Sequence, residues 1–465
     1  MKVEQLYTNC LSEAAYYIES NGEAAIVDPI RDYHQYIERA KKDNATIKYV
    51  FETHFHADFV SGHIDLAKAT GAKIIYGPST ETSYPVYVAS DGEKFLLGGI
   101  EIEAMHTPGH TPESTSYLLR DENKKDYCVF TGDTLFVGDV GRPDLLGGKF
   151  SKEEMAGWMY DSLNKKIKTL ADDVIVYPAH GPGSACGKNL GKETFSTIGV
   201  QKKLNYALQE MSKEEFVKKV TEGISAPPQY FPLNAAINKK GYLSFDEIVK
   251  RNLKAISVDE FETEIKNGAT VLDTRNENSF VDGFVKGSIF IGLNGRFAEW
   301  VGTILKIDEP LILVCDEGKE EEAITRMARV GYENVKGFLH GGFESWKNAN
   351  KPVDMVITID VEEMALDLKH ENNITVMDVR KETEFENAHL ENAKNVVLQN
   401  FESQLRDSGI SSDENIFVHC QAGYRSVIAA SIMKRKGFTK MKNIAGGWNA
   451  IVKTDMPVVV PAAAQ

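Results

Sequence analysis

The sequence predicts an α/β protein of about three domains. Three observations carry this prediction. The chain of 465 residues is too long for a single hydrophobic core, short apolar runs alternate with polar turns and helical stretches, and the C-terminal half repeats itself. Its 42% hydrophobic and 26% charged residues are typical of globular proteins.

The first domain is expected over residues 1–195. Its strands are predicted from short β-rich runs bounded by polar turns: EAAIVDP at 23–29, IKYVFET at 47–53, AKIIYG at 72–77 and DYCVFTGD at 126–133. Residues 196–255 are expected to form a helical bridge that completes or links this domain. Its helices are predicted at 201–220 and 244–253, on either side of the proline-bearing APPQYFP at 226–232.

The C-terminal half contains a duplicated domain. DTRNENSF at 273 recurs as DVRKETEF at 378, and GGFESW at 341 recurs as GGWNAI at 446. Cys315 and Cys420 keep the same offset of 105 residues. This period is longer than the roughly 20 to 50 residues of solenoid repeats, so two tandem α/β domains are expected, at 256–355 and 356–460.

Charge and cysteine content exclude several classes of protein. A net charge of -15 disfavours nucleic-acid binding, which depends on clustered Lys and Arg. The first residues, MKVEQLYTNCLSEAAYYIES, lack the basic start and apolar run of a signal peptide or membrane anchor. Five widely separated cysteines do not form a disulfide framework. We therefore expect free thiols in a cytoplasmic protein without a membrane partner.

Several polar residues of the first domain follow apolar runs, where a rigid sheet can present ligands on loops. Any one of these histidines is more often structural, but the ordered set predicts a metal site because imidazole and carboxylate are common metal ligands. The motifs THFHAD, TPGHT, GD and AH resemble those of the metallo-β-lactamase fold superfamily, which implies an αββα sandwich. The set comprises His54, His56, Asp58, His110, Asp133 and His180.

Phe59 bears on the number of metals. Two-metal hydrolases of this superfamily, glyoxalase II among them, place a second-metal histidine where Phe59 lies, and phenylalanine cannot ligate. The surrounding residues resemble the persulfide dioxygenase branch instead. Members of that branch usually keep this histidine as well, so Phe59 departs from both patterns, and more from that of a two-metal hydrolase. That resemblance implies one Fe(II) per chain, held by His54, His110 and Asp133, with open positions for substrate sulfur and O2. His56, Asp58 and His180 would then orient the ligands or water.

Two more residues near this site are candidates for function. VGDVGRPDL resembles the Gly-Arg-x-Asp segment of the same branch, which suggests that Arg142 clamps an anionic thiol carrier; pairing with Asp144 is the structural alternative. Cys186, among small residues in GPGSACGKNLG, is either an accessory thiol that accepts sulfur or a buried structural cysteine.

The last domain supplies a second chemistry. In IFVHCQAGYRS, Cys420 follows an apolar strand and precedes a helix, with Gly423 permitting a tight loop and Arg425 adding positive charge. Backbone N–H groups and a helix N-terminus that face the sulfur favour a thiolate or persulfide anion. Residues 358–458 resemble a rhodanese, a sulfurtransferase domain, which makes Cys420 and Arg425 the expected catalytic pair and Gly423 a substrate-binding residue. An inert rhodanese-like binding module is the alternative.

The middle domain is expected to be catalytically silent. Its loop CDEGKEEE has Glu320 at the position of Arg425 and a net charge of -4, which repels anionic sulfur species. The three-part order resembles bacterial persulfide dioxygenase and sulfurtransferase fusion proteins. It implies oxidation of a small persulfide by O2 to sulfite, and sulfur transfer on Cys420 that gives thiosulfate. The carrier thiol, the direction of transfer and a homo-oligomer stay open. The rival hypotheses are a glyoxalase II-like zinc thiolester hydrolase and a non-enzymatic persulfide sensor.

Overall fold

The computed structural model describes residues 1–145, 149–224, 226–371 and 373–460. The chain divides into two compact units. The first comprises Met1–Ile248 with Met327–Tyr332, and the second comprises Val249–Arg326 with Glu333–Gln465.

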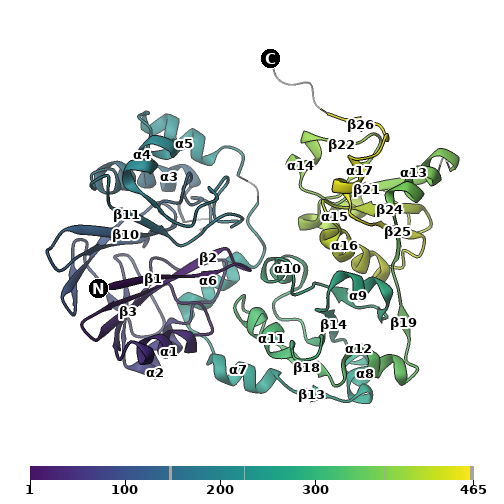
Figure 1. Ribbon diagram of the computed structural model, residues 1–465, viewed down its shortest axis with the longest axis horizontal. Coiled ribbons are helices and arrows are strands. Elements are labelled where there is room, and N and C mark those ends of the chain that lie inside the picture. The colour runs from purple at the N-terminus through teal and green to yellow at the C-terminus, as the bar shows by residue number, and fades with distance from the viewer. Residues whose placement is uncertain (146–148, 225, 372, 461–465) are drawn as a thin grey trace. The chain divides into compact units, whose positions relative to one another are not determined.

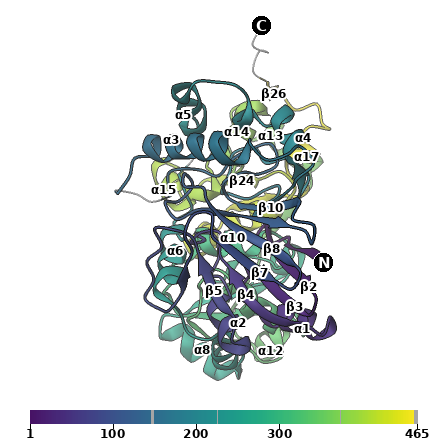
Figure 2. The same cartoon turned by 90° about the vertical axis from the view of Figure 1, so that its left-hand side faces the viewer.

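Two six-stranded sheets form the centre of the first unit (Figure 2). The first sheet has the order β1 Lys2–Thr8, β2 Glu13–Ser20, β3 Glu23–Val27, β4 Thr46–Phe51, β5 Lys73–Tyr76, β6 Tyr87–Val88. The second has the order β12 Ser196–Thr197, β11 Ile175–Pro178, β10 Asp126–Gly132, β9 Thr115–Arg120, β8 Ile100–His106, β7 Lys94–Leu97. The four strands predicted from the apolar runs are confirmed as β3, β4, β5 and β10.

Helices cover the outer faces of these sheets and complete an αββα sandwich (Figure 1). Helices α1 His34–Lys42 and α2 His63–Thr70 contact the first sheet. Apolar side chains of α3 Lys152–Ser162, the π-helical turn Leu163–Ile167, α4 Ile198–Leu204 and α5 Lys213–Thr221 pack on the second sheet. A second core fills the space between the sheets, where Tyr16, Phe51, Tyr117 and Phe130 are buried, so both faces of each sheet exclude water.

The predicted bridge contains one helix that the sequence pattern did not indicate. Helix α7 Phe245–Asn252 agrees with the second predicted helix, whereas the range 201–220 predicted as one helix is divided into α4, a 3-10 turn at Tyr206–Leu208 and α5. In addition, α6 Phe231–Lys240 begins inside the proline-bearing segment taken as a separator. Pro232 lies in the first turn of α6, where a missing N–H is tolerated because the first helical N–H groups have no partner within the helix.

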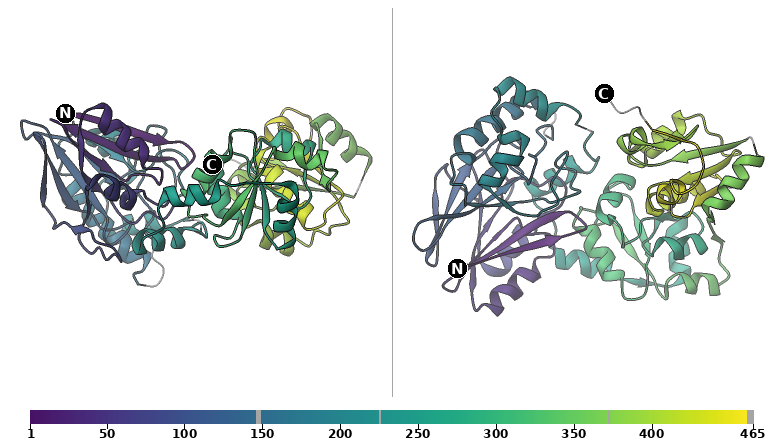
Figure 3. Two further views of the ribbon diagram at one scale, coloured as in Figure 1. Left: turned by 90° about the horizontal axis from the view of Figure 1, so that it is seen from below. Right: turned by 45° about the horizontal axis from the view of Figure 1, so that its top comes forward.

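The second unit contains two α/β domains, each with a parallel five-stranded sheet and a small two-stranded sheet (Figure 3). The middle domain has the orders β13 Ala255–Ile256, β18 Val335–Leu339, β17 Leu311–Val314, β14 Thr270–Asp273, β16 Ile289–Phe290 and β15 Phe284–Val285, β19 Val353–Asp354. The last domain has the orders β20 Ile357–Ile359, β25 Met441–Ile444, β24 Asn415–His419, β21 Ile374–Asp378, β23 Lys394–Asn395 and β22 His389–Leu390, β26 Val458–Val459.

The helices of the second unit follow the same duplication. The middle domain contains α8 Val258–Lys266, α9 Glu277–Asp282, α10 Phe297–Ile304, α11 Glu320–Ala328 and α12 Gly342–Asn348. The last domain contains α13 Val361–His370, α14 Glu382–Asn387, α15 Phe401–Asp407, α16 Tyr424–Arg435 and α17 Trp448–Ile451.

Both α/β domains contain the same buried ion pair. At the end of β14, Nη2 of Arg275 lies 2.6 Å from the Asp273 carboxylate and donates to the Gly283 carbonyl at 2.8 Å. At the end of β21, Nη2 of Arg380 lies 2.7 Å from Asp378 and donates to the Ala388 carbonyl at 2.8 Å. A buried charge pair is tolerated when hydrogen bonds satisfy its remaining donors, as they do in both copies.

Candidate metal and sulfur sites

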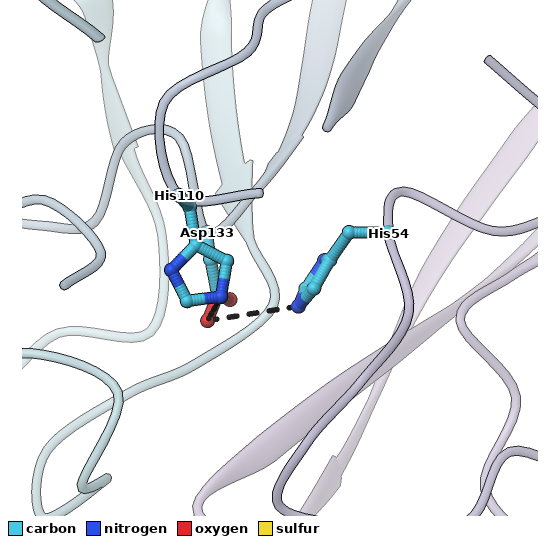
Figure 4. A group of neighbouring side chains, drawn as sticks. All are labelled: His54, His110 and Asp133. Atoms are coloured by element: carbon cyan, nitrogen blue, oxygen red, sulfur yellow. Dashed lines mark ion pairs between the residues drawn. The ribbon is translucent and has the colours of Figure 1, made fainter. Parts of the chain in front are cut away.

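Three buried side chains converge between the two sheets of the first unit (Figure 4). His54 follows β4, whereas His110 and Asp133 lie on loops of the second sheet and approach from the opposite side. One ligand atom from each lies within 4.8 Å of the others. Nε2 of His110 lies 3.3 Å from Oδ2 of Asp133, and Nε2 of His54 lies 3.8 Å from the same oxygen.

The second ring nitrogen of each histidine fixes which atom faces the site. The Thr53 hydroxyl donates to Asp28 at 2.8 Å, so it accepts from Nδ1 of His54 at 2.9 Å. Nδ1 of His110 donates to the Arg142 carbonyl at 2.8 Å. In a neutral ring, each Nε2 atom is then left with a lone pair that faces the site, as metal ligands require.

The burial and charge of this cluster fit a cation. His54, His110 and Asp133 are at most 2% exposed. Burial, followed by the nearby imidazoles, holds the pKa of His54 well below its usual range, so the ring is neutral. Within the described residues, Nε2 of His110 and both carboxylate oxygens of Asp133 make no hydrogen bond. Atoms with lone pairs that face each other at 3.3 Å repel unless a cation lies between them.

His56, Asp58 and His180 form a second buried set beside the first. Nε2 of His180 lies 3.4 Å from Oδ2 of Asp58 and 3.6 Å from Oδ1 of Asp133, while its Nδ1 contacts the Ser12 carbonyl at 3.1 Å. The Phe59 ring is fully buried, 4.3 Å from the His56 ring by centroids, and contributes no ligand atom.

Arg142 and Cys186 are both buried next to the ligands. The Arg142 guanidinium makes two hydrogen bonds to Asp144, at 2.7 and 2.8 Å, so the structure contains the pairing that was the alternative to a substrate clamp. Cys186 is 1% exposed and contributes a ligand atom to a cluster with Asp133 and His180. Burial, followed by the charges of Asp58 and Asp133, raises the pKa of the Cys186 thiol well above its usual value.

Sequence reasoning missed the residues that hold the ligand loop in place. Asp28, which directly follows β3, accepts from both the Thr53 backbone N–H at 2.7 Å and the Thr53 hydroxyl. Asn238 of α6 donates to the carbonyls of His56 and Phe59, each at 2.8 Å. Aspartate directly after a strand could have suggested the first contact. The second joins residues about 180 positions apart, with no local signal.

A cavity of about 990 Å³ in the first unit opens beside the loops that contain the candidate metal ligands. Its wall combines aromatic side chains with both charges: Phe55, Phe150, Trp158 and Phe231, then Lys149, Lys165, Lys166 and Lys239, then Glu81, Glu113 and Asp161. Thr111, next to His110, and Ala57, next to His56, also line it, so the cavity reaches the ligand loops.

The Cys420 loop joins the central strand β24 to helix α16 in the last domain. Gly423 has a φ of +123°, and its N–H donates to the Cys420 sulfur at 3.1 Å. The backbone N–H of Trp448 donates to the Cys420 carbonyl at 2.7 Å. Arg425 makes a two-point ion pair with Glu384 at 2.6 and 2.8 Å. The loop thus presents a backbone donor to the sulfur, as the sequence indicated.

The matching thiol of the middle domain has different surroundings. Burial raises the pKa of Cys315 to about 12, and Glu320 and Asp273 contribute in the same direction. An uncharged thiol is a poor nucleophile, so this loop lacks the features that favour a persulfide anion.

The fold and the two sites define an αββα domain with a candidate metal site, followed by two related α/β domains, the second of which holds a cysteine loop. Residues 8–180 match the metallo-beta-lactamase superfamily, and residues 257–349 and 361–454 each match the rhodanese-like domain. The chain belongs to the metallo-beta-lactamase superfamily and has two rhodanese-like domains after that domain.

Known relatives differ in their activity. The chain is 37% identical over 176 residues to the cytoplasmic hydroxyacylglutathione hydrolase of Arabidopsis thaliana, covering 37% of this chain and 65% of that protein. It is 30% identical over 204 residues to the mitochondrial persulfide dioxygenase ETHE1 of Homo sapiens, covering 42% of this chain and 70% of that protein. It thus spans just under two thirds of the plant hydrolase's length.

A solved structure covers more of the chain. The metallo-beta-lactamase from Staphylococcus aureus subsp. aureus COL superposes with a TM-score of 0.65 at 32% identity, covering 73% of this chain and 98% of that one. As for membranes, none of the helices in the described ranges is long and apolar enough to span a bilayer.

Proposed function

We propose that the first domain oxidises a small-molecule persulfide with O2 at a single Fe(II), and that Cys420 transfers sulfane sulfur in the last domain. The observation that supports this most directly is the buried set of two imidazoles and one carboxylate, with Phe59 at the place of a further histidine. A face of two His and one carboxylate leaves coordination positions open and is typical of Fe(II) oxygenases.

The chain's own residues hold and orient the ligands. Thr53 and Asp28 fix the His54 ring, and the Arg142 carbonyl fixes the His110 ring. Bound iron would supply the redox chemistry of oxygen with the persulfide sulfur. The balanced reaction converts R–S–SH, O2 and one water to R–SH, sulfite and two protons.

The cavity supports a small anionic thiol carrier as the source of the persulfide. Aromatic side chains can bury the apolar part of such a molecule, and Lys149 offers a cation for its charged end. Arg142 is bound to Asp144 and is 5% exposed, so Lys149 is better placed for this role than the Arg142 guanidinium.

The last domain would consume the product of the first. Sulfite attacks the outer sulfur of a Cys420 persulfide, the S–S bond breaks, and thiosulfate leaves with the Cys420 thiolate restored. Joining both sites in one chain raises the effective concentration of sulfite near Cys420.

Oxygen uptake tests the first half of this proposal. Anaerobically iron-loaded enzyme should consume O2 and release sulfite when given glutathione persulfide or coenzyme A persulfide, and His110→Ala should lose iron and uptake together. Iron-loaded enzyme that leaves O2 unchanged with every small persulfide offered would refute it.

A thiolester hydrolase is the second candidate because hydroxyacylglutathione hydrolases are similarly close relatives, and because Nε2 of His180 lies near both Asp58 and Asp133. Zinc-loaded enzyme that cleaves S-lactoylglutathione, with no oxygen uptake in the iron form, would favour it.

Product analysis tests the second half. With persulfide and O2, the intact enzyme should yield thiosulfate, whereas Cys420→Ser should consume O2 normally and stop at sulfite. Equal thiosulfate from both, after subtraction of the uncatalysed reaction of sulfite with persulfide, would show that Cys420 is not the acceptor.

A further inference from the structure

One side chain of the Cys420 loop reaches out of its own domain. Tyr424 directly follows Gly423 and begins α16. Its hydroxyl donates to the Gly292 carbonyl of the middle domain at 2.6 Å. Burial raises the pKa of Tyr424, so the phenol stays protonated and remains a donor at neutral pH.

The middle domain has a matching space for this ring. The Phe290 ring lies 5.7 Å from the Tyr424 ring by centroids, in an edge-to-face arrangement. A Cβ atom added to Gly295 would lie only 2.3 to 2.7 Å from three carbons of the Tyr424 ring. Gly295 is absent from the positive-φ glycines, so backbone conformation does not require glycine there, whereas the ring does.

The cysteine loop of the middle domain does not use the position equivalent to Tyr424 for a contact of this kind. Lys319 holds the position of Tyr424 in the middle-domain loop, 105 residues earlier, and it pairs with Glu322 of its own domain at 2.9 Å. The contact is therefore not symmetric: the Cys420 loop of the last domain reaches the middle domain, whereas Lys319 of the Cys315 loop pairs within its own domain.

We propose that the middle domain holds the Cys420 loop in its active shape through Tyr424, which makes Tyr424 a positioning residue and Gly295 the position that admits it. This inference rests on the proposed sulfur transfer at Cys420. It assigns to the middle domain, which is expected to be catalytically silent itself, a part in the chemistry of its neighbour.

The contact acts through the residue next to Tyr424. Gly423 donates its N–H to the Cys420 sulfur at 3.1 Å, with a φ of +123°. Because glycine is conformationally permissive, its own backbone preference does little to keep this N–H pointed at the sulfur. With Tyr424 anchored on one side and Cys420 fixed by the Trp448 N–H on the other, the N–H of Gly423 is held toward the sulfur. An aligned donor stabilises thiolate and persulfide anions.

Tyr424→Phe and Gly295→Ala in the full-length chain test the proposal. Each should lower kcat for sulfur transfer from thiosulfate to cyanide by about three- to tenfold, with KM little changed, because the donor at the anionic sulfur is misaligned. Each should also raise the midpoint of the Cys420 alkylation rate against pH by about half a unit or more, measured by peptide mass spectrometry with iodoacetamide.

Ser431→Ala is the matched control. Its hydroxyl accepts from the Phe290 N–H at 3.0 Å, so it joins the same two domains from α16 without touching the loop. This variant should lower the melting temperature and leave the alkylation profile and kcat unchanged. Wild-type profiles in both Tyr424→Phe and Gly295→Ala, or an equal shift in Ser431→Ala, would overturn the proposal. Transfer activity that survives in Cys420→Ser would instead contradict the proposed function itself.

Discussion

Gly141 offers a way to disturb the metal site without removing a ligand. A Cβ atom at this position would lie 2.3 Å from the Asp133 carbonyl oxygen and 2.9 Å from Nδ1 of His110. Gly141 also donates its N–H to the same Asp133 carbonyl at 2.9 Å, so the loop is tightly packed against both ligands. Gly141→Ala therefore pushes on two proposed ligands at once.

The size of the effect follows from these distances. Relief of the contact requires a displacement of about 1 Å, because non-bonded carbon contacts are comfortable only near 3.5 Å. Functional sites need their side chains within about 0.5 Å of the productive geometry, so this displacement exceeds what they tolerate. We expect metal affinity to fall by about 10- to 100-fold, the range seen when residues that orient ligands are changed. Overpacking should cost about 1 to 3 kcal/mol of folding free energy.

Competition with a chelator measures the metal affinity of the wild type and of Gly141→Ala. Iron or zinc bound per chain is determined at increasing chelator concentration, with circular dichroism to verify the fold. Gly157→Ala is the control, since its Cβ would meet only the flexible end of Lys213 at 3.1 Å. Wild-type affinity in folded Gly141→Ala would refute the reasoning, because the clash would then be absorbed without moving either ligand.

Four further outcomes are expected. Phe59→His should raise zinc bound per chain from one toward two, measured by elemental analysis, because His180 already lies near both Asp58 and Asp133; unchanged stoichiometry contradicts this. Cys315, with its pKa raised to about 12, should react with iodoacetamide only slowly near pH 8 and about tenfold faster per pH unit above it, provided the fold persists. Cys186, whose thiol pKa is raised by burial, should be alkylated more slowly than Cys420. Metal removal should lower the melting temperature, since ligand at about 100 times its Kd adds about 3 kcal/mol; coincident apo and holo transitions would argue against a site this tight.

The sequence predicts parts of the molecule that depend on local pattern. The strands around His54 and Asp133 were predictable because each combines an apolar run with a turn signal, and the Cys420 loop because strand, glycine and helix follow one another. The pairing of Arg142 with Asp144 was foreseeable from their spacing of two residues. These features are set by neighbours in the chain.

Long-range contacts were not predictable in this way. Helix α6 begins in a segment rich in proline, and only packing explains why Asn238 lies against the loop of His56. The hydrogen bond between Tyr424 and Gly292 joins residues 132 positions apart, and neither sequence motif hints at the other. Such contacts depend on which surfaces meet after each domain has folded.

The buried pair of Asp273 with Arg275, repeated by Asp378 with Arg380, has an evolutionary consequence. Each pair is satisfied inside its own domain by a backbone carbonyl, Gly283 in one copy and Ala388 in the other, and the loop after the central strand contributes none of the described hydrogen bonds. After gene duplication, that loop can drift while the fold persists. The domain of Cys315 has such an altered, acidic loop, and its buried pair is intact. A domain that no longer needs its own catalytic loop still has a rigid surface. Natural selection can then use that surface to hold a loop of the neighbouring domain, as the middle domain holds Tyr424.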